Sequence, residues 1–158
     1  MSNDPSGANF HSAAPILRVG DLSVSLDYYG RALGFAVDWR DGMGMASVSR
    51  DRCTLMLCQG DQGHPGTWTW IGVADADALH EELKARGAIV RHAPTDYPWA
   101  RELQVGDPDG NVLRFGADPR VGAEPGEWLD MHGGCWTQDS FGSWQRRPGR
   151  RWGSRADD

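Results

Sequence analysis

The sequence predicts an α+β protein in which a β-α-β-β-β unit occurs twice in succession. Three observations carry this prediction. The chain has 158 residues, which suits one domain with a buried core. Its apolar pattern alternates between strand and helix periods in the same order in two consecutive segments. Matching short sequences also recur in both segments, in the same order.

The first unit is expected at residues 13–58. Residues 16–19, I-L-R-V, are expected to form a strand, and Asp21 is placed as the N-cap of a helix. Gly34 ends that helix, because glycine readily adopts the left-handed conformation found just after a helix. The three strands that complete the unit are expected at residues 35–39, 43–49 and 53–58.

The second unit is expected at residues 67–117, after a Gly- and Pro-rich linker at 59–66. A strand at 68–73 precedes a helix that Asp75 caps and Gly87 ends. The remaining strands are expected at residues 88–91, 103–105 and 111–115. The last two flank Asp107-Pro108-Asp109-Gly110, whose proline and glycine suit a type I turn with a bulged glycine.

Three pairs of matching sequences support the repeat. Val19-Gly20-Asp21 recurs 54 positions later as Val73-Ala74-Asp75, and Leu33 to Val37 recurs 53 positions later as Arg86 to Val90. The pattern D-x-x-x-L-x-L that starts at Asp51 recurs 58 positions later as D-x-x-x-L-x-F. Slightly different spacings indicate small loop insertions between two copies of one unit.

Both ends of the chain lie outside the repeat. Residues 1–12 are polar and predict a flexible arm. Residues 118–158 form a tail rich in tryptophan and arginine without a helix or strand period, and we expect disorder after Pro148. Residues 127–130, Glu-Trp-Leu-Asp, are expected to dock on the domain or on a neighbouring subunit.

Composition excludes several classes of partner. With 16 Lys and Arg against 22 Asp and Glu, the net charge of −6 argues against a nucleic-acid partner. No apolar run approaches the roughly 20 residues that span a bilayer, so no membrane partner is expected. Three cysteines without metal-site spacing, and no signal peptide at the N-terminus, predict a cytoplasmic protein.

The chain resembles the glyoxalase / bleomycin resistance / dioxygenase family, also called vicinal oxygen chelate proteins. The likeness covers residues 13–117 and is carried by V-G-D-L at 19–22, Y-Y at 28–29, L-G-F at 33–35, V-A-D at 73–75, L-K-A-R-G at 83–87 and, most specifically, D-P-D-G-N at 107–111. The resemblance implies paired β-α-β-β-β modules whose sheets curl around a concave ligand site, with helices outside. It also implies a homodimer.

Alternation within the strands separates two faces. One set is uniformly aliphatic or aromatic and should face the helices: Leu17, Val19, Leu55, Leu57, Ile71, Val73, Leu113 and Phe115. The opposite set is mixed and should line the concavity: Ala14, Ile16, Arg18, Thr54, Met56, Cys58, Trp68, Trp70, Val112 and Arg114. Two large rings are seldom left in water without a binding or packing purpose, so Trp68 and Trp70 favour a ligand site.

Metal-dependent relatives place His, Gln or Glu at four strand positions, which the resemblance maps onto this chain. The residues there are Ala14, Met56, Trp68 and Arg114. None of these side chains supplies a metal ligand, and a guanidinium repels a cation. We therefore expect neither a metal site nor another cofactor.

The sequence thus predicts a metal-free protein that resembles bleomycin resistance proteins and sequesters a planar or cationic antibiotic-like molecule by aromatic stacking. The predicted ligand-binding residues are Arg18, Met56, Trp68, Trp70, Trp99, Glu102, Gln104 and Arg114. No catalytic residue is predicted. If the turn at 108–110 has three residues, Gln104 lies opposite Arg114 and Glu102 one pair further on.

Two other interpretations stay open. The first is a glyoxalase-like lyase or isomerase, or a dioxygenase, whose metal is held by displaced ligands. The second is a non-catalytic scaffold or regulatory subunit, which the tryptophan-rich tail favours. Arg114 and Glu102 could likewise form a structural ion pair or a recognition group whose charge is only partly neutralised.

Overall fold

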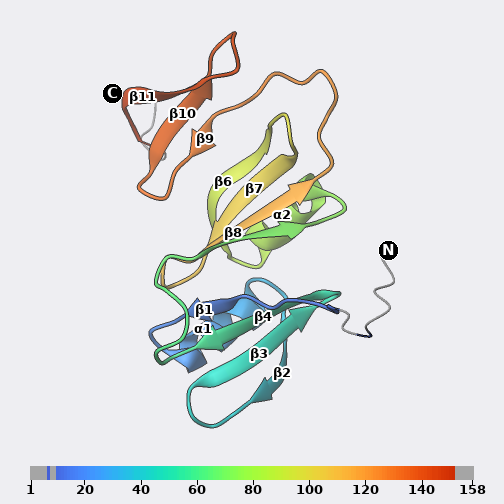
Figure 1. Cartoon of the computed structure of the whole chain (residues 1–158), viewed down its shortest axis with the longest axis vertical. Helices are drawn as coiled ribbons and strands as arrows, with labels where there is room; N and C mark the ends of the chain where they lie inside the picture. Colours follow the sequence, from blue (N-terminus) through green and yellow to red (C-terminus); the bar gives the residue numbers. More distant parts are fainter. Residues whose placement is uncertain (1–6, 8–9, 152–158) are drawn as a thin grey trace.

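The computed structural model describes residue 7 and residues 10–151. Two modules with the same element order follow one another, and a third, smaller sheet lies beyond them (Figure 1). The predicted α+β class and the repeated β-α-β-β-β order are therefore confirmed. No helix within the described residues is long and apolar enough to cross a membrane.

The first module forms a four-stranded mixed sheet with the strand order β1-β4-β3-β2. Strand β1 runs parallel to β4, and the other pairs are antiparallel. Its elements are β1 (Ile16–Arg18), α1 (Leu22–Arg31), β2 (Ala36–Arg40), β3 (Met45–Arg50) and β4 (Cys53–Cys58).

The second module repeats this topology with the order β5-β8-β7-β6, and β5 runs parallel to β8. Its elements are β5 (Trp68–Gly72), α2 (Ala76–Ala85), β6 (Ile89–Asp96), β7 (Arg101–Gly106) and β8 (Val112–Ala117). Strand β6 continues five residues beyond the predicted 88–91. The turn at 108–110 has its predicted three residues, because Asp107 N donates to the carbonyl of Asn111.

The predicted helix ends are confirmed at both helices. The Asp21 carboxylate accepts a hydrogen bond from Val24 N, and the Asp75 carboxylate accepts one from Ala78 N. Each satisfies a backbone donor that has no partner inside the helix. Gly34 and Gly87 follow the helices with φ angles of 76° and 81°, a conformation that costs glycine little.

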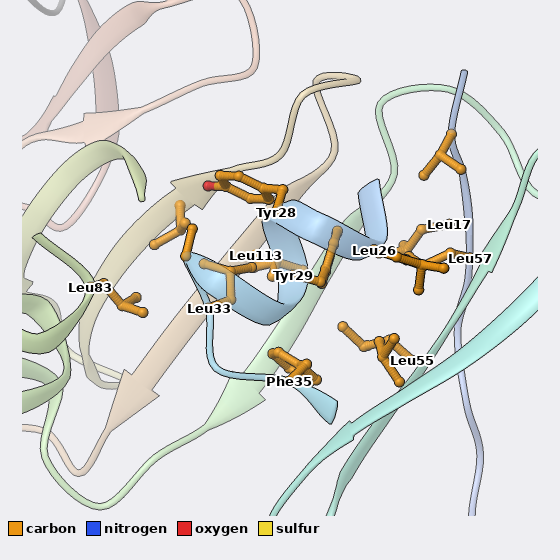
Figure 2. Close-up of a cluster of buried hydrophobic side chains, with 14 of the residues drawn as sticks. Leu17, Leu26, Tyr28, Tyr29, Leu33, Phe35, Leu55, Leu57, Leu83 and Leu113 are labelled. Atoms are coloured by element: carbon orange, nitrogen blue, oxygen red, sulfur yellow. The ribbon is translucent and has the colours of Figure 1, made fainter. Parts of the chain in front are cut away.

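One hydrophobic core joins the two modules. Figure 2 shows helix α1 between Leu17, Leu55 and Leu57 of its own module and Leu83 and Leu113 of the second. Of the eight residues predicted to face the helices, six are buried in this core, and Ile71 and Val73 pack against it partly buried. The predicted strand register is therefore confirmed.

Polar contacts from α1 reinforce the junction at the turn between β7 and β8. The Tyr29 hydroxyl donates to the Asp107 carboxylate at 3.0 Å, and the Tyr28 hydroxyl donates to the carbonyl of Gly106 at 2.6 Å. The Asn111 amide donates to the carbonyl of Arg18 at 2.9 Å. Burial raises the pKa of both tyrosines, so their hydroxyls stay protonated donors.

The tail differs from its prediction. It forms an antiparallel sheet of β9 (Trp128–Leu129), β10 (Gly134–Gln138) and β11 (Trp144–Arg151), in the order β11-β10-β9. The expectation of no strand was wrong: Asp130 and Asp139 accept backbone hydrogen bonds in tight turns that pair these strands. The sequence pattern missed them because β9 has only two residues and β11, W-Q-R-R-P-G-R-R, is almost wholly polar. Disorder expected after Pro148 is contradicted as far as Arg151. Residues 152–158, and residues 1–6 and 8–9 of the N-terminal arm, lie outside the described residues.

Candidate functional site

Six of the eight predicted site residues belong to the second module. Trp68 and Trp70 alternate with core residues along β5, and Arg114 pairs in register with Trp70 on β8. Gln104 on β7 pairs with Arg114, and Glu102 lies one pair further along, as predicted. Alternate residues on paired strands point to the same side of a sheet, so these side chains share the face opposite the core.

Glu102 is the centre of this face. Its side chain is 1% exposed, and its Oε1 accepts hydrogen bonds from the indole N–H groups of Trp70 at 2.9 Å and Trp99 at 2.8 Å. Arg114 completes the group by donating Nη2 to Oε1 and Nε to Oε2, both at 3.0 Å. Four donors thus satisfy one buried carboxylate. Glu102 orients two indoles and balances Arg114, so it has no free charge to attract a cationic ligand.

Gln104 binds neighbours other than Arg114. Its Oε1 accepts a hydrogen bond from Arg91 at 2.5 Å, and its Nε2 donates to the carbonyl of Leu129 at 2.9 Å. Arg91 also donates to the carbonyl of Asp130 at 2.9 Å. Both side chains therefore connect the second module to the tail. The sequence predicted that the tail would dock at 127–130, and it docks on this face of its own chain.

Trp70 presents the most accessible ring of the predicted set. A Cβ atom placed on Gly116 would lie 2.7 Å from Cζ2 of Trp70, and one placed on Gly72 would lie 3.4 Å from the same ring. The indole therefore rests directly on the backbone of two glycines. Its other side remains open, and the residue is 53% exposed. The bond to Glu102 fixes this ring in position.

Trp68 and Trp99 belong to an aromatic cluster that includes the tail. Trp99 stacks on Tyr97 with centroids 5.0 Å apart and planes 4° apart, and Trp128 meets both rings edge-on. Trp128 also lies 6.0 Å from Trp68, centroid to centroid. Trp99 nevertheless remains 45% exposed. Trp70 and Trp99 are therefore the accessible rings, whereas the tail covers Trp68.

Arg18 and Met56 lie on the sheet of the first module and not beside the other six residues. Met56 pairs with Ile16 on β1 and Ser47 on β3. Arg18 donates to the carbonyls of Gln62 at 2.9 Å and Gly63 at 3.2 Å, so it fastens the linker between the modules. Within one chain these two residues do not form a single site with Trp70 and Glu102.

The four positions that hold metal in related enzymes do not suit a metal here. Met56 and Trp68 offer no ligating atom of the usual kind, and Ala14 has no donor at all. The guanidinium of Arg114 already binds the nearby carboxylate of Glu102. Across residues 10–151, no three His, Cys, Asp or Glu side chains lie close enough together to share a metal ion. These residues therefore do not fit the metal of the enzymatic relatives.

A cavity of about 570 Å³ lies away from this face, between the two modules near the start of α2. Core residues such as Leu33, Ile71 and Phe115 line it, together with the charged residues Arg50 and Glu82. Arg50 and Glu82 bind one another at 2.8 Å. None of the eight predicted site residues lines this cavity.

Sequence reasoning missed four residues of the site: Arg91, Tyr97, Trp128 and Trp144, the last of which lies 6.0 Å from Trp99 between ring centroids. Arg91 lies at a bulge where β6 shifts register against β7, so alternation could not assign its face. Tyr97 follows β6 outside any predicted strand. Trp128 was visible in the predicted docking segment, but only the structure shows which rings it meets.

Three known proteins are similar to this chain, one in sequence and two as solved structures. An uncharacterized protein of Mycolicibacterium smegmatis is 33% identical over 102 residues, which are 63% of this chain and 87% of that protein. The bleomycin-binding protein of the bleomycin producer Streptomyces verticillus, solved with copper(II)-bleomycin, is 32% identical with a TM-score of 0.60, covering 70% of this chain and 98% of that chain. TnmS3, an antibiotic-binding protein from Streptomyces sp. CB03234, is 26% identical with a TM-score of 0.61 at the same coverage.

The family model agrees with these relatives. The Glyoxalase/Bleomycin resistance protein/Dioxygenase superfamily matches residues 10–115, which include both modules up to Phe115 in β8. The tail sheet lies beyond the matched residues. With its repeated modules, its parallel β1–β4 and β5–β8 pairs and this match, the chain belongs to the Glyoxalase/Bleomycin resistance protein/Dioxygenase superfamily.

Proposed function

We propose that this protein binds a planar, antibiotic-like small molecule by aromatic stacking and sequesters it without chemical change. The observation that carries the proposal is the open ring of Trp70. It is held from below by Gly72 and Gly116 and at its edge by the buried Glu102. A ring fixed in this way loses little conformational freedom when a ligand stacks on it.

Trp99 extends the same surface. Its N–H group shares the Oε1 atom of Glu102 with Trp70, so one acceptor sets the positions of both indoles. Tyr97 supports the stacked side of Trp99. Two half-exposed rings converging on one anchor suit a flat aromatic molecule better than a flexible aliphatic one.

The relatives support the same ligand class. The proteins from Streptomyces verticillus and Streptomyces sp. CB03234 are described as bleomycin-binding and antibiotic-binding. Bleomycin is therefore the first probe to use on this chain.

A second copy of the chain belongs to the proposal, because the first module leaves its outer strand uncovered. All five residues of β2 are exposed, and Val37 and Trp39 are 48% and 44% exposed. Two exposed apolar side chains on one edge strand favour contact with a second protein chain. In a homodimer, the face that carries Arg18 and Met56 could meet the second module of the partner. Native mass spectrometry should give twice the chain mass, and a monomer at micromolar concentration would refute this part.

Isothermal titration with bleomycin tests the ligand class. Trp70→Ala should weaken binding by about 1–3 kcal/mol, the usual loss when a stacking ring is removed. Phe141→Ala is the matched control, because Phe141 is an exposed aromatic residue in the turn between β10 and β11. Its affinity should equal that of the wild type.

Two outcomes would contradict the proposal. Equal affinities of Trp70→Ala and wild type would remove that ring from the site. One tightly held metal ion per chain, found by elemental analysis of the purified protein, would favour the metal-dependent enzyme.

A further inference from the structure

We propose that residues 126–130, here called the strap, occupy the ligand-binding face of the second module and must be displaced when a ligand uses Trp68 and Arg114. This inference rests on the proposed function, since it concerns the same face. It adds that the strap, a segment of the same chain, competes with the ligand for this face.

The second module holds the backbone of the strap as it would hold a bound peptide. Three side chains donate to three strap carbonyls: Tyr97 to Glu127, Gln104 to Leu129 and Arg91 to Asp130. The amide of Gly126 donates to the carbonyl of Asp96 at 2.9 Å. Burial raises the pKa of the Tyr97 hydroxyl well above its usual range, so it remains a donor at physiological pH.

The side chain of Trp128 takes the place that a planar ligand would need. Its ring lies over the Arg114 guanidinium, with the ring centroid 4.8 Å from Cζ. It is also tilted by 34° against Trp68, and it meets Tyr97 and Trp99 edge-on. A ligand cannot stack on Trp68 or cover Arg114 while Trp128 stays there. Trp128 therefore occupies the position of the ligand and does not merely extend the lining of the site.

Glycine at position 126 allows the strap to approach so closely. A Cβ atom on Gly126 would overlap Cγ2 of Thr95, closer than real atoms approach, so either the strap or the Thr95 side chain must move. The Thr95 hydroxyl donates a hydrogen bond to the carbonyl of Ala93 at 2.9 Å, which opposes rotation of its side chain and favours movement of the strap. This makes Gly126→Ala a way to loosen the strap without removing a side chain from the binding face.

The connection to β8 makes displacement feasible. Residues 118–125 are exposed between Ala117 and the strap, so their movement breaks the exposed ion pair between Arg120 and Asp77 but uncovers none of the core. Because β9 pairs with β10, the strap leaves the face together with the tail sheet. A tether of this length gives the strap an effective concentration of about millimolar, so modest contacts keep it bound. The family match ends at residue 115, so the strap lies beyond the part of the chain that the family model matches.

The experiment compares wild type with Gly126→Ala, Trp128→Ala and the control Phe141→Ala, all as full chains. The first probe is 1-anilinonaphthalene-8-sulfonate, an aromatic anion whose fluorescence reports exposed apolar surface whatever the natural ligand is. Both strap variants should bind it at least tenfold more tightly than wild type and control. Hydrogen exchange in β7 and β8 should stay as slow as in wild type, which separates release of the strap from general unfolding.

The second probe is bleomycin. Because the ligand no longer competes with the strap, Gly126→Ala should bind bleomycin at least tenfold more tightly than wild type. Added bleomycin should also speed hydrogen exchange at residues 126–130 of the wild type.

The outcomes separate this inference from the proposed function. Unchanged dye binding in either strap variant would overturn the strap. So would bleomycin binding by Gly126→Ala that is equal to or weaker than that of a wild type that binds bleomycin. Tighter dye binding without bleomycin binding by any variant would support the strap and overturn bleomycin-type binding.

Discussion

Replacing Glu102 by glutamine should remove the centre of the binding face while keeping its shape. Glutamine has the same size, but it loses the charge that balances Arg114 and turns one of two acceptor atoms into a donor. Four donors converge on this carboxylate, so at least one of them loses its acceptor. An unpaired donor in a buried site is costly.

The structure sets the size of the effect. Removing one partner of a fully buried ion pair costs about 3–5 kcal/mol. Glu102 is 1% exposed, but the Arg114 side chain is 25% exposed and can regain some water. We therefore expect Glu102→Gln to lower the free energy of unfolding by about 2–4 kcal/mol. For a chain of this length, that corresponds to a melting temperature lower by roughly 6–12 °C.

Urea unfolding followed by tryptophan fluorescence measures this loss. The matched control is Glu81→Gln on α2, where the carboxylate is 71% exposed and its ion pair with Lys84 should contribute less than about 0.5 kcal/mol. A double variant, Glu102→Leu with Arg114→Met, should lose less than the sum of its single variants, because neither charge is left alone. A loss below about 1 kcal/mol in Glu102→Gln would refute the central role of this carboxylate.

Three further changes test other parts of the structure. Tyr29→Phe removes a buried donor to the Asp107 carboxylate and should lower the free energy of unfolding by about 1.5–3 kcal/mol in urea titrations; no change would mean that this contact does not hold the modules together. Gly116→Ala should displace the Trp70 ring and weaken bleomycin binding in calorimetry, and unchanged binding would show that the ring does not need its glycine support. Burial lowers the pKa of His92 below its usual 6.5, so the unfolded chain binds a proton more readily than the folded chain. The free energy of unfolding should therefore be highest above pH 6.5 and should decrease as the pH falls below it. In urea titrations at pH 7.5 and 5.5, His92→Gln should show a smaller difference than wild type, whereas an equal difference would exclude His92 as its source.

Local pattern was sufficient to predict the two modules. Asp21 and Asp75 cap helices at the predicted positions, because an N-cap depends on residues only three positions away. Alternation correctly predicted that the side chains of Leu17 and Leu113 point into the core. An error of one residue in the register would have turned both side chains to the opposite face. The three-residue turn likewise placed Gln104 opposite Arg114.

The site was predictable only in part. Alternation placed Trp70 and Arg114 on one face, but it could not show that Glu102 would bind Arg114 and two indoles together. That arrangement depends on Trp99, which lies in a turn, where side-chain direction has no period. The tail escaped prediction for a related reason, since β9 has only two residues and is stabilised by contacts with distant strands.

The hydrogen bonds from Tyr28 to Gly106 and from Tyr29 to Asp107 affect the order in which the chain can fold. Each joins residues 78 positions apart, so the first module cannot bury these tyrosines by itself. During synthesis, helix α1 must wait with both aromatic side chains exposed until β7 and its turn have left the ribosome. Contacts of such long range also slow folding in general. A nascent chain that stalls within the linker at 59–66 would thus present an incomplete core, and one repeat expressed alone should be prone to aggregate.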